Sequence, residues 1–206
     1  MKFEIKYQET YSRSELLLRS LFGWLYIFIP HAFLLAFLGI WSAILTFISF
    51  WVILFTGRYP QSFFEFQVDL IRWNNRLNAR IYNLSDGYPA FGLKVEDEFT
   101  DFDLEYPESI DRGLVLIRFF FGFIYVLIPH GFILYFRTIA MLILSFLAFW
   151  VVLFTGKYPE SWHEFNVNTL RWIIRVNLYM TYMSDTYPPF NGKPIAAGEG
   201  FEQRDN

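Results

Sequence analysis

The chain of 206 residues contains no cysteine, which excludes a disulfide framework, thiol chemistry and a cysteine-ligated iron–sulfur site. It also lacks a glycine-rich phosphate-binding loop, a nucleophile elbow and the His-Glu-x-x-His pattern of zinc peptidases. The sequence therefore offers no motif for a catalytic centre. We expect a protein that is not an enzyme and that binds no cofactor.

Charge is missing from two long stretches of the sequence. Residues 20–56 contain no Asp, Glu, Lys or Arg, and residues 119–155 contain only Arg137. The whole chain is 54% hydrophobic and 22% aromatic. Apolar runs of about 18 residues or more are typical of membrane-spanning segments. We therefore predict an all-α integral membrane protein that has no nucleic-acid partner.

The chain is one unit written twice, because residues 3–91 recur in degraded form and without gaps as residues 102–190. The shared strings are Ile-Pro-His (29–31, 128–130), Phe-Thr-Gly-Arg/Lys-Tyr-Pro (55–60, 154–159), Arg-Trp-x-x-Arg (72–76, 171–175) and Ser-Asp-x-Tyr-Pro-x-Phe (85–91, 184–190). The division that follows is a first repeat (1–92), an acidic linker (93–111), a second repeat (112–191) and a C-terminal tail (192–206). The composition of the tail predicts disorder.

The length of the uncharged stretches predicts that the chain crosses the membrane twice in each repeat. As one helix, residues 20–56 would be about 55 Å long, whereas the hydrocarbon core is about 30 Å thick. Two spans fit if the chain turns near Leu38-Gly39 and, in the second repeat, near the polar pair Arg137-Thr138. We therefore expect a transmembrane helical hairpin in each repeat, at about 16–57 and 115–156.

A second arrangement of these stretches remains open. Pro30 and Pro129 each lack the backbone N–H that a helix interior needs. A break at these prolines would give a short re-entrant segment followed by one long tilted helix. The charge of Arg137 favours the hairpin, because it would then lie at the tip, outside the bilayer.

An amphipathic helix follows each hairpin. Gly57 and Gly156 occupy the place where a helix commonly ends in a left-handed residue. Ser62-Phe-Phe-Glu65 and Ser161-Trp-His-Glu164 then have the capping-box pattern that starts a new helix. An apolar stripe rich in Trp and Phe beside an arginine face is typical of a helix at the membrane interface. We expect these helices at about 62–84 and 161–183.

The distribution of Lys and Arg predicts the orientation. In the hairpin arrangement every basic residue except Arg137 lies on one side, which the positive-inside rule assigns to the cytoplasm. Both termini, both amphipathic helices and the acidic linker would then be cytoplasmic. Because each repeat has two spans, the copies would be parallel and related by an axis along the membrane normal.

The shared strings resemble those of a bacterial family of small membrane proteins that carry a domain of unknown function, in single and tandem forms. The resemblance covers about 15–92 and 114–191, and it is most specific in the Phe-Thr-Gly-Lys-Tyr-Pro and Ser-Asp-Thr-Tyr-Pro-Pro-Phe strings of the second copy. The first copy departs from it at Ala90, where the second has a proline. The resemblance implies a location in the bacterial inner (cytoplasmic) membrane and assigns no activity to any residue.

His31 and His130 are the first candidates for a functional site. Each lies 12 residues after an arginine, Arg19 or Arg118, which is about 18 Å along a helix. Two histidines at equal depth have the arrangement of axial haem ligands or of a buried proton site. The structural alternative is that each imidazole bonds to a carbonyl group freed by the neighbouring proline. Contact with lipid or with a partner protein is a further alternative.

The second candidates are arginine pairs beside a tryptophan in each amphipathic helix. The residues are Arg72, Trp73 and Arg76 in the first repeat and Arg171, Trp172 and Arg175 in the second. Their spacing predicts an exposed face that contacts anionic lipid head groups or an acidic partner, or one that only anchors the protein. Asp86 and Asp185 are expected to bond to these arginines or to amides of the Tyr-Pro turns.

These observations favour a non-catalytic accessory or structural membrane protein, a subunit or organiser of a larger inner-membrane assembly. Its expected partners are membrane lipids and other membrane protein subunits. One alternative is a protein that binds anionic lipid or handles lipid. The other alternative is an electron carrier with a bis-histidine haem.

Overall fold

Each repeat forms the same set of elements in the computed structural model, which describes residues 1–194. The elements of the first repeat are β1 (Lys2–Ile5), α1 (Arg13–Gly23), η1 (Trp24–Phe28), α2 (Ile29–Thr56) and α3 (Gln61–Ile81). Those of the second are β2 (Thr100–Asp103), α4 (Arg112–Gly122), η2 (Phe123–Leu127), α5 (Ile128–Thr155) and α6 (Glu160–Met180). The disorder expected for the tail concerns residues that lie mainly outside the described part of the chain.

The uncharged stretches form single helices rather than hairpins. The helical segments run on without a break for 44 residues, from Arg13 to Thr56 and from Arg112 to Thr155. Each of these long helices is about 66 Å in length. The hairpins expected at 16–57 and 115–156 are therefore wrong. A lone glycine such as Gly39 costs a helix only about 1 kcal/mol, which is too little to break one that packs along its length.

The prolines do not break the long helices either, so the re-entrant alternative is also wrong. A π-helical turn, η1 or η2, precedes Pro30 or Pro129 and carries the helix through the proline. Each long helix ends where the sequence predicted. Gly57 and Gly156 have φ of 73° and 74°, which confirms the left-handed caps.

Arg137 lies inside α5 and not at a hairpin tip. Its Nε donates to Thr169 Oγ1 at 3.1 Å, and its guanidinium lies over the ring of Phe165 at 4.4 Å. The polar side chain is thus turned inward onto α6. This explains how a helix that is otherwise uncharged accommodates one arginine.

The amphipathic helices exist as predicted, but they start differently. Pro60 and Pro159 are the N-cap residues, without a side-chain cap, and Ser62 and Ser161 lie one position inside the first turn. The expected capping boxes are therefore wrong. Proline supplies a fixed φ that suits the start of a helix, so a serine cap is not needed here.

A two-stranded antiparallel sheet corrects the all-α prediction. β1 pairs with β2 so that Lys2 faces Asp103, Phe3 faces Phe102 and Glu4 faces Asp101. Phe3 and Phe102 are equivalent residues of the two repeats, so the pairing maps onto itself when the repeats are exchanged. A pseudo-two-fold axis therefore passes between these two phenylalanines.

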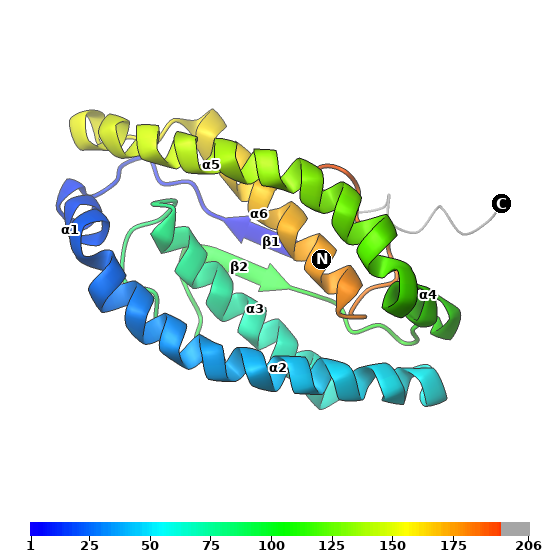
Figure 1. Ribbon diagram of the computed structural model, residues 1–206. Coiled ribbons are helices and arrows are strands. Elements are labelled where there is room, and N and C mark those ends of the chain that lie inside the picture. The colour runs from blue at the N-terminus through cyan, green and yellow to red at the C-terminus, as the bar shows by residue number, and fades with distance from the viewer. Residues whose placement is uncertain (195–206) are drawn as a thin grey trace.

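The elements are arranged around this axis in the order α5, α6, β1, β2, α3, α2 (Figure 1). The two long helices lie at opposite edges of the molecule and run in opposite directions, so each begins near the end of the other. Phe50 near the end of α2 stacks on Phe119 of α4, with ring centroids 4.6 Å apart. The strand pair lies midway along both long helices (Figure 1).

Burial divides the helices into two kinds. α3 and α6 are buried over most of their surface. The long helices bury one narrow face, and their remaining circumference exposes large apolar side chains from one end to the other. Both long helices are apolar and long enough to cross a membrane.

Candidate functional site

The Ile-Pro-His turn is held by the Tyr-Pro segment of the same repeat. Pro30 has no N–H, so the carbonyl of Tyr26, four residues earlier, lacks its helical donor. The hydroxyl of Tyr88 donates to this carbonyl at 3.1 Å. In the second repeat the hydroxyl of Tyr187 donates to the carbonyl of Tyr125 at 3.0 Å. The freed carbonyls thus bond to tyrosine hydroxyls, which corrects the expectation that the imidazoles bond to them.

His31 and His130 are fully buried and bond to the tryptophans of the Arg-Trp-x-x-Arg strings. The indole N–H of Trp73 donates to Nδ1 of His31 at 2.8 Å, and that of Trp172 donates to Nδ1 of His130 at 2.9 Å. An Nδ1 that accepts a hydrogen bond belongs to a neutral ring with its proton on Nε2. The histidines and tryptophans that the sequence put forward separately are therefore partners.

The phenylalanine that closes each repeat covers one face of the imidazole. Phe91 stacks on His31 with centroids 4.0 Å apart, and Phe190 stacks on His130 at 4.1 Å. Each histidine is enclosed by its own repeat, at the start of α2 or of α5, and these helices start at opposite ends of the molecule (Figure 1). The structure does not bring the two histidines together as ligands of one haem iron. Among residues 1–194 there is no group of three or more His, Asp and Glu that could hold a metal ion.

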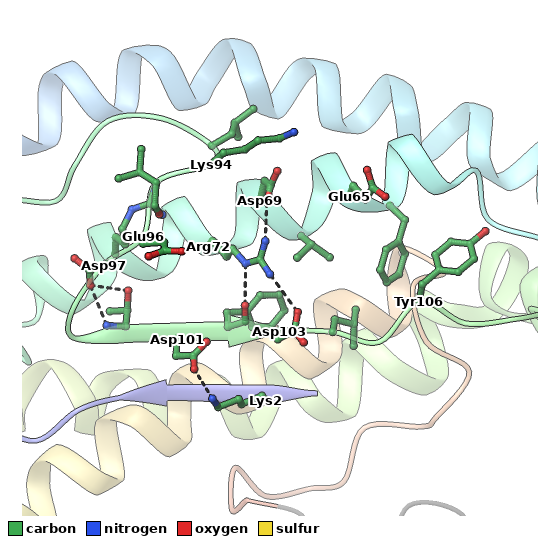
Figure 2. A pocket seen from close by; sticks show the side chains of 18 of the residues that line it. Lys2, Glu65, Asp69, Arg72, Lys94, Glu96, Asp97, Asp101, Asp103 and Tyr106 are labelled. Carbon is green, nitrogen blue, oxygen red and sulfur yellow. Dashed lines mark hydrogen bonds and ion pairs between the residues drawn. The ribbon is translucent and has the colours of Figure 1, made fainter.

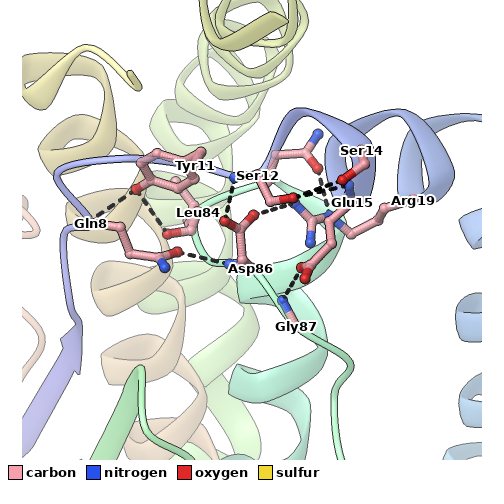
Figure 3. A network of polar contacts seen from close by, with 10 residues as sticks. Gln8, Tyr11, Ser12, Ser14, Glu15, Arg19, Leu84, Asp86 and Gly87 are labelled. Atoms are coloured by element: carbon pink, nitrogen blue, oxygen red, sulfur yellow. Dashed lines mark hydrogen bonds and ion pairs between the residues drawn. The ribbon is translucent and has the colours of Figure 1, made fainter. Parts of the chain in front are cut away.

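Asp86 and Asp185 join the Tyr-Pro turns to the long helices. One oxygen of Asp86 accepts from the backbone N–H of Ser12 at 2.7 Å, and the other pairs with Arg19 at 3.4 Å (Figure 3). Asp185 repeats this arrangement with the N–H of Asp111 and with Arg118. The partners are thus the arginines of α1 and α4, which the sequence analysis treated only as depth markers. Their recurrence in both copies was the signal that could have found them.

Arg72 and Arg171 hold the strands. Nε of Arg72 donates to the carbonyl of Phe102 at 2.9 Å, and Nη2 of Arg171 donates to the carbonyl of the equivalent Phe3 at 3.0 Å. Arg72 also pairs with Asp69 at 2.8 Å. These contacts attach α3 to β2 and α6 to β1.

Arg76 and Arg175 hold the segments that follow the Tyr-Pro turns. Arg76 donates to the carbonyl of Gly92, and Arg175 donates at 3.4 Å to the carbonyl of Asn191, which is the equivalent residue. Arg76, Arg171 and Arg175 are all buried, so the exposed arginine face expected for these helices is wrong. Their recurrence reflects the construction of the fold, since each bonds to backbone carbonyl groups.

The Phe-Thr-Gly-Arg/Lys-Tyr-Pro strings receive the chain of the other repeat. The carbonyl of Gly57 accepts from the N–H of Ile110 at 2.8 Å, and that of Gly156 accepts from the N–H of Tyr11 at 2.8 Å. The arm that precedes each long helix is therefore bound at the end of the other long helix. We call this reciprocal pair of contacts the clasp.

Comparison with known families identifies the repeats. A family model described as Domain of unknown function (DUF4389) matches residues 13–92 and 115–191. The chain belongs to this family. Its two matches confirm the tandem repeat, and no curated protein or solved structure matches the chain.

His163 is one of the differences between the two DUF4389 repeats, because the equivalent residue is Phe64. It lies edge-on to Tyr7 and Tyr158, with centroids 5.4 and 5.9 Å apart. Burial lowers the pKa of His163 to about 4. The ring is therefore neutral at physiological pH and fills the place of a phenylalanine.

A cleft of about 910 Å³ lies between α3, β2 and the segment 93–106 (Figure 2). Some of its charged groups are paired with one another: Arg72 bonds to Asp69 and Asp103, and Lys2 pairs with Asp101 at 2.5 Å. These ion pairs join the linker and β2 to α3 and β1.

A buried ion pair fixes the linker at one end of this cleft. Arg80 donates to both oxygens of Asp97, at 2.8 and 2.6 Å. Burial alone would raise the pKa of Asp97, but the hydrogen bonds and charge of Arg80 bring it below its usual value. Part of the acidic linker is thus ordered by an arginine of α3.

Proposed function

We propose that the protein is a non-catalytic membrane protein with a structural or accessory role, and that it lies in the plane of the bilayer. The support is twofold. The histidines, arginines and aspartates of the shared strings make contacts within the fold, as His31 does with Trp73 and Arg19 with Asp86. The surface that remains for contact with other molecules is largely the apolar exterior of the two long helices.

The position of the strand pair carries the proposal. It lies midway along the long helices (Figure 1). Its residues Lys2, Glu4 and Asp103 are exposed. If the helices stood upright in a bilayer, these charges would lie at its centre, where ionic groups are costly and strand edges lack donors and acceptors. An upright helix of about 66 Å would also exceed the hydrocarbon core twofold.

An in-plane arrangement removes both problems. The pseudo-two-fold axis then runs along the membrane normal, with the strand pair towards water and the long helices within one leaflet. The two termini of the described chain lie on the same side, since Arg171 bonds to the carbonyls of both Phe3 and Gly192. We assign that side to the cytoplasm of a bacterial cell. This arrangement replaces the topology with two membrane spans in each repeat, because that topology depended on the hairpins.

Membrane depth along one long helix tests the arrangement. The chain has no cysteine, so single-cysteine variants at Leu18, Phe37 and Phe55, which are 52%, 60% and 73% exposed, can each carry one spin label. In vesicles of anionic phospholipid we expect similar depths at all three sites, measured from the relative access of oxygen and of a nickel chelate. An upright helix would instead give a deep site at Phe37 between two shallow ones, and that result contradicts the proposal. A label at Glu4 serves as the aqueous control.

The accessory role makes a separate prediction about assembly. An apolar surface of this extent on a protein without its own reaction is typical of one that contacts lipid and membrane subunits together. Extraction of native membranes in mild detergent should yield the protein in a complex larger than one chain. Recovery only as a monomer would contradict the accessory role. It would not contradict the in-plane arrangement, which the depth measurement tests separately.

A further inference from the structure

The two repeats differ at a cavity beside the first long helix. It has a volume of about 500 Å³ and lies between α1, η1 and the C-terminal end of α3. Arg19, Asn78 and Asn83 supply polar groups to its wall, whereas Trp24 and Phe28 supply apolar surface. A few polar groups at one end of an apolar cavity of this size are typical of a site for a small amphipathic ligand.

In the second repeat a methionine occupies the equivalent space. Met180, the counterpart of Ile81, packs so closely on Gly122 that a Cβ placed there would lie 2.9 Å from Cε of Met180. A Cβ at Gly23, the counterpart of Gly122, would meet only Arg19 and Ile27 of its own helix, at 3.4 and 4.0 Å. Ile81 lines the cavity but is 40% exposed, and it is not among the atoms nearest to a Cβ at Gly23. Other lining residues also differ between the repeats, among them Ser20 and Tyr82, but Met180 is the side chain that lies against Gly122 in the second repeat.

Within the part of the chain that the structure describes, Arg19 in the cavity wall has an N–H donor group without an acceptor, whereas the same group of its counterpart Arg118 is hydrogen-bonded. Nη1 of Arg118 donates to the carbonyls of Tyr179 and Ser184, both at 2.9 Å. Arg19 donates through Nε to Asn83 at 2.7 Å and through Nη2 to Asp86 at 3.4 Å, and within residues 1–194 its Nη1 has no acceptor.

That donor points to an anionic ligand group. Arg19 is only 7% exposed and lines the cavity, so an anionic group bound there would lie beside its guanidinium. A guanidinium group with free N–H donors binds phosphate well, because the two groups match in charge and in geometry. The neighbouring amide of Asn78 adds a neutral hydrogen-bonding group to the same wall.

We propose that this cavity binds one phospholipid of the surrounding membrane. The phosphate bonds to Arg19, and an acyl chain lies against Trp24, Phe28 and Ile81. Trp24 and Phe28 are 62% and 52% exposed, so the apolar end of the cavity opens where the long helix meets lipid. The proposal rests on the membrane location argued above, and it adds a defined site to the general contact with lipid.

Photo-crosslinking in vesicles tests the site. The probe is a phosphatidylglycerol with a diazirine on one acyl chain, and labelled peptides are located by mass spectrometry. We expect residues 24–28 and 78–82 to be labelled at least about fivefold more than their counterparts 123–127 and 177–181. Equal labelling of both sets indicates bulk lipid only and overturns the proposal. If neither long helix is labelled anywhere, the membrane location itself fails.

Exchanging Ile81 and Met180 between the repeats gives a matched pair of variants. Ile81→Met should abolish the excess labelling of the first repeat, and Met180→Ile should create it in the second. Each residue already occupies the equivalent position in the other repeat, so both variants should fold, as thermal unfolding will show. Unchanged labelling in both variants overturns the proposal.

A second probe separates the phosphate from the acyl chain. A diacylglycerol with the same diazirine chain lacks the group that Arg19 would bind. We expect it to label residues 24–28 at least about tenfold less, because a hydrogen bond to a charged group is lost. Equal labelling by the two probes would show a cavity for acyl chains alone and would contradict the role given to Arg19.

Discussion

Side chains that recur in both repeats are joined in pairs drawn from different motifs. The imidazole of His31 accepts from the indole of Trp73, 42 positions later, and Asp86 accepts from Arg19, 67 positions earlier. Removing one member of such a pair leaves the other buried without a partner, which costs more than the bond itself is worth. The recurrence of these residues is thereby explained without a catalytic role.

The tyrosine that bonds to the proline-freed carbonyl can be tested by a double-mutant cycle. Tyr187→Phe should lower the free energy of unfolding by about 1 kcal/mol, because the carbonyl of Tyr125 loses its donor. In a Pro129→Ala background the alanine N–H can bond to that carbonyl, and the cost should fall by about half or more. Denaturant unfolding followed by circular dichroism measures both. Equal costs in the two backgrounds would contradict this account, and Tyr135→Phe, at a residue 64% exposed, is the control.

His163 should make stability depend on pH. Its folded pKa of about 4 lies below the unfolded value of about 6.5, so between these values the unfolded chain binds more protons. The contribution of neutral His163 to the free energy of unfolding is complete above about pH 6.5. As the pH falls towards 4, the free energy of unfolding decreases by up to roughly 3 kcal/mol. His163→Phe, which copies Phe64, should remove this part of the pH dependence. Parallel curves for the two proteins between pH 6.5 and 4.5 would refute it.

The sequence predicted some of the helices correctly and others wrongly. The second helix of each repeat and its separation from the first were predictable, because Gly57 and Gly156 end the long helices in a way that local sequence specifies. The hairpin prediction failed because it assumed that an apolar stretch must fit the thickness of a bilayer. Helix length is limited in that way only if the helix stands upright, and no local residue encodes that choice.

The glycine that caps the first long helix and a glycine inside that helix should respond oppositely to alanine. Gly57→Ala should destabilise the protein by about 1–2 kcal/mol, because φ is 73° there and a Cβ would crowd Arg112 at 3.2 Å. Gly39→Ala should stabilise it by about 0.5–1 kcal/mol, since the position is helical and a Cβ meets nothing within 4 Å. Thermal unfolding of both variants in one detergent measures the contrast. A stabilising Gly57→Ala would contradict the assignment of the helix end.

The arrangement of the whole molecule depends on contacts between distant parts of the chain. β1 alternates polar and apolar residues as a half-buried strand does, but each strand has only four residues and neither indicates which segment it pairs with. The clasp is made by backbone groups of Gly57 and Ile110, which sequence reading does not reveal. The duplication can be read from the sequence. The symmetry axis between Phe3 and Phe102 cannot, because its position depends on the register in which the two strands pair.

Cutting the chain should leave the molecule assembled. Fragments 1–98 and 99–206, expressed together, should copurify in equal amounts, because the strand pairing and the clasp join them without the covalent link. Replacing both Phe3 and Phe102 by Asp should abolish copurification, since two buried charges would then face each other on the axis. Separate recovery of the unaltered fragments would contradict the interlocked architecture.

The strand register also determines which repeats can form homodimers. In a symmetric dimer of two first repeats, Lys2 would face Glu4 of its partner twice, an attractive pairing. Two second repeats would place Asp101 opposite Asp103 twice, which is repulsive. A protein made of the first repeat alone should therefore close its fold as a homodimer, whereas the second repeat needs a basic partner strand. The two-repeat protein is then equivalent to a heterodimer whose subunits are joined in one chain. Lys2 of the first repeat, which pairs with Asp101, favours the second repeat as its partner.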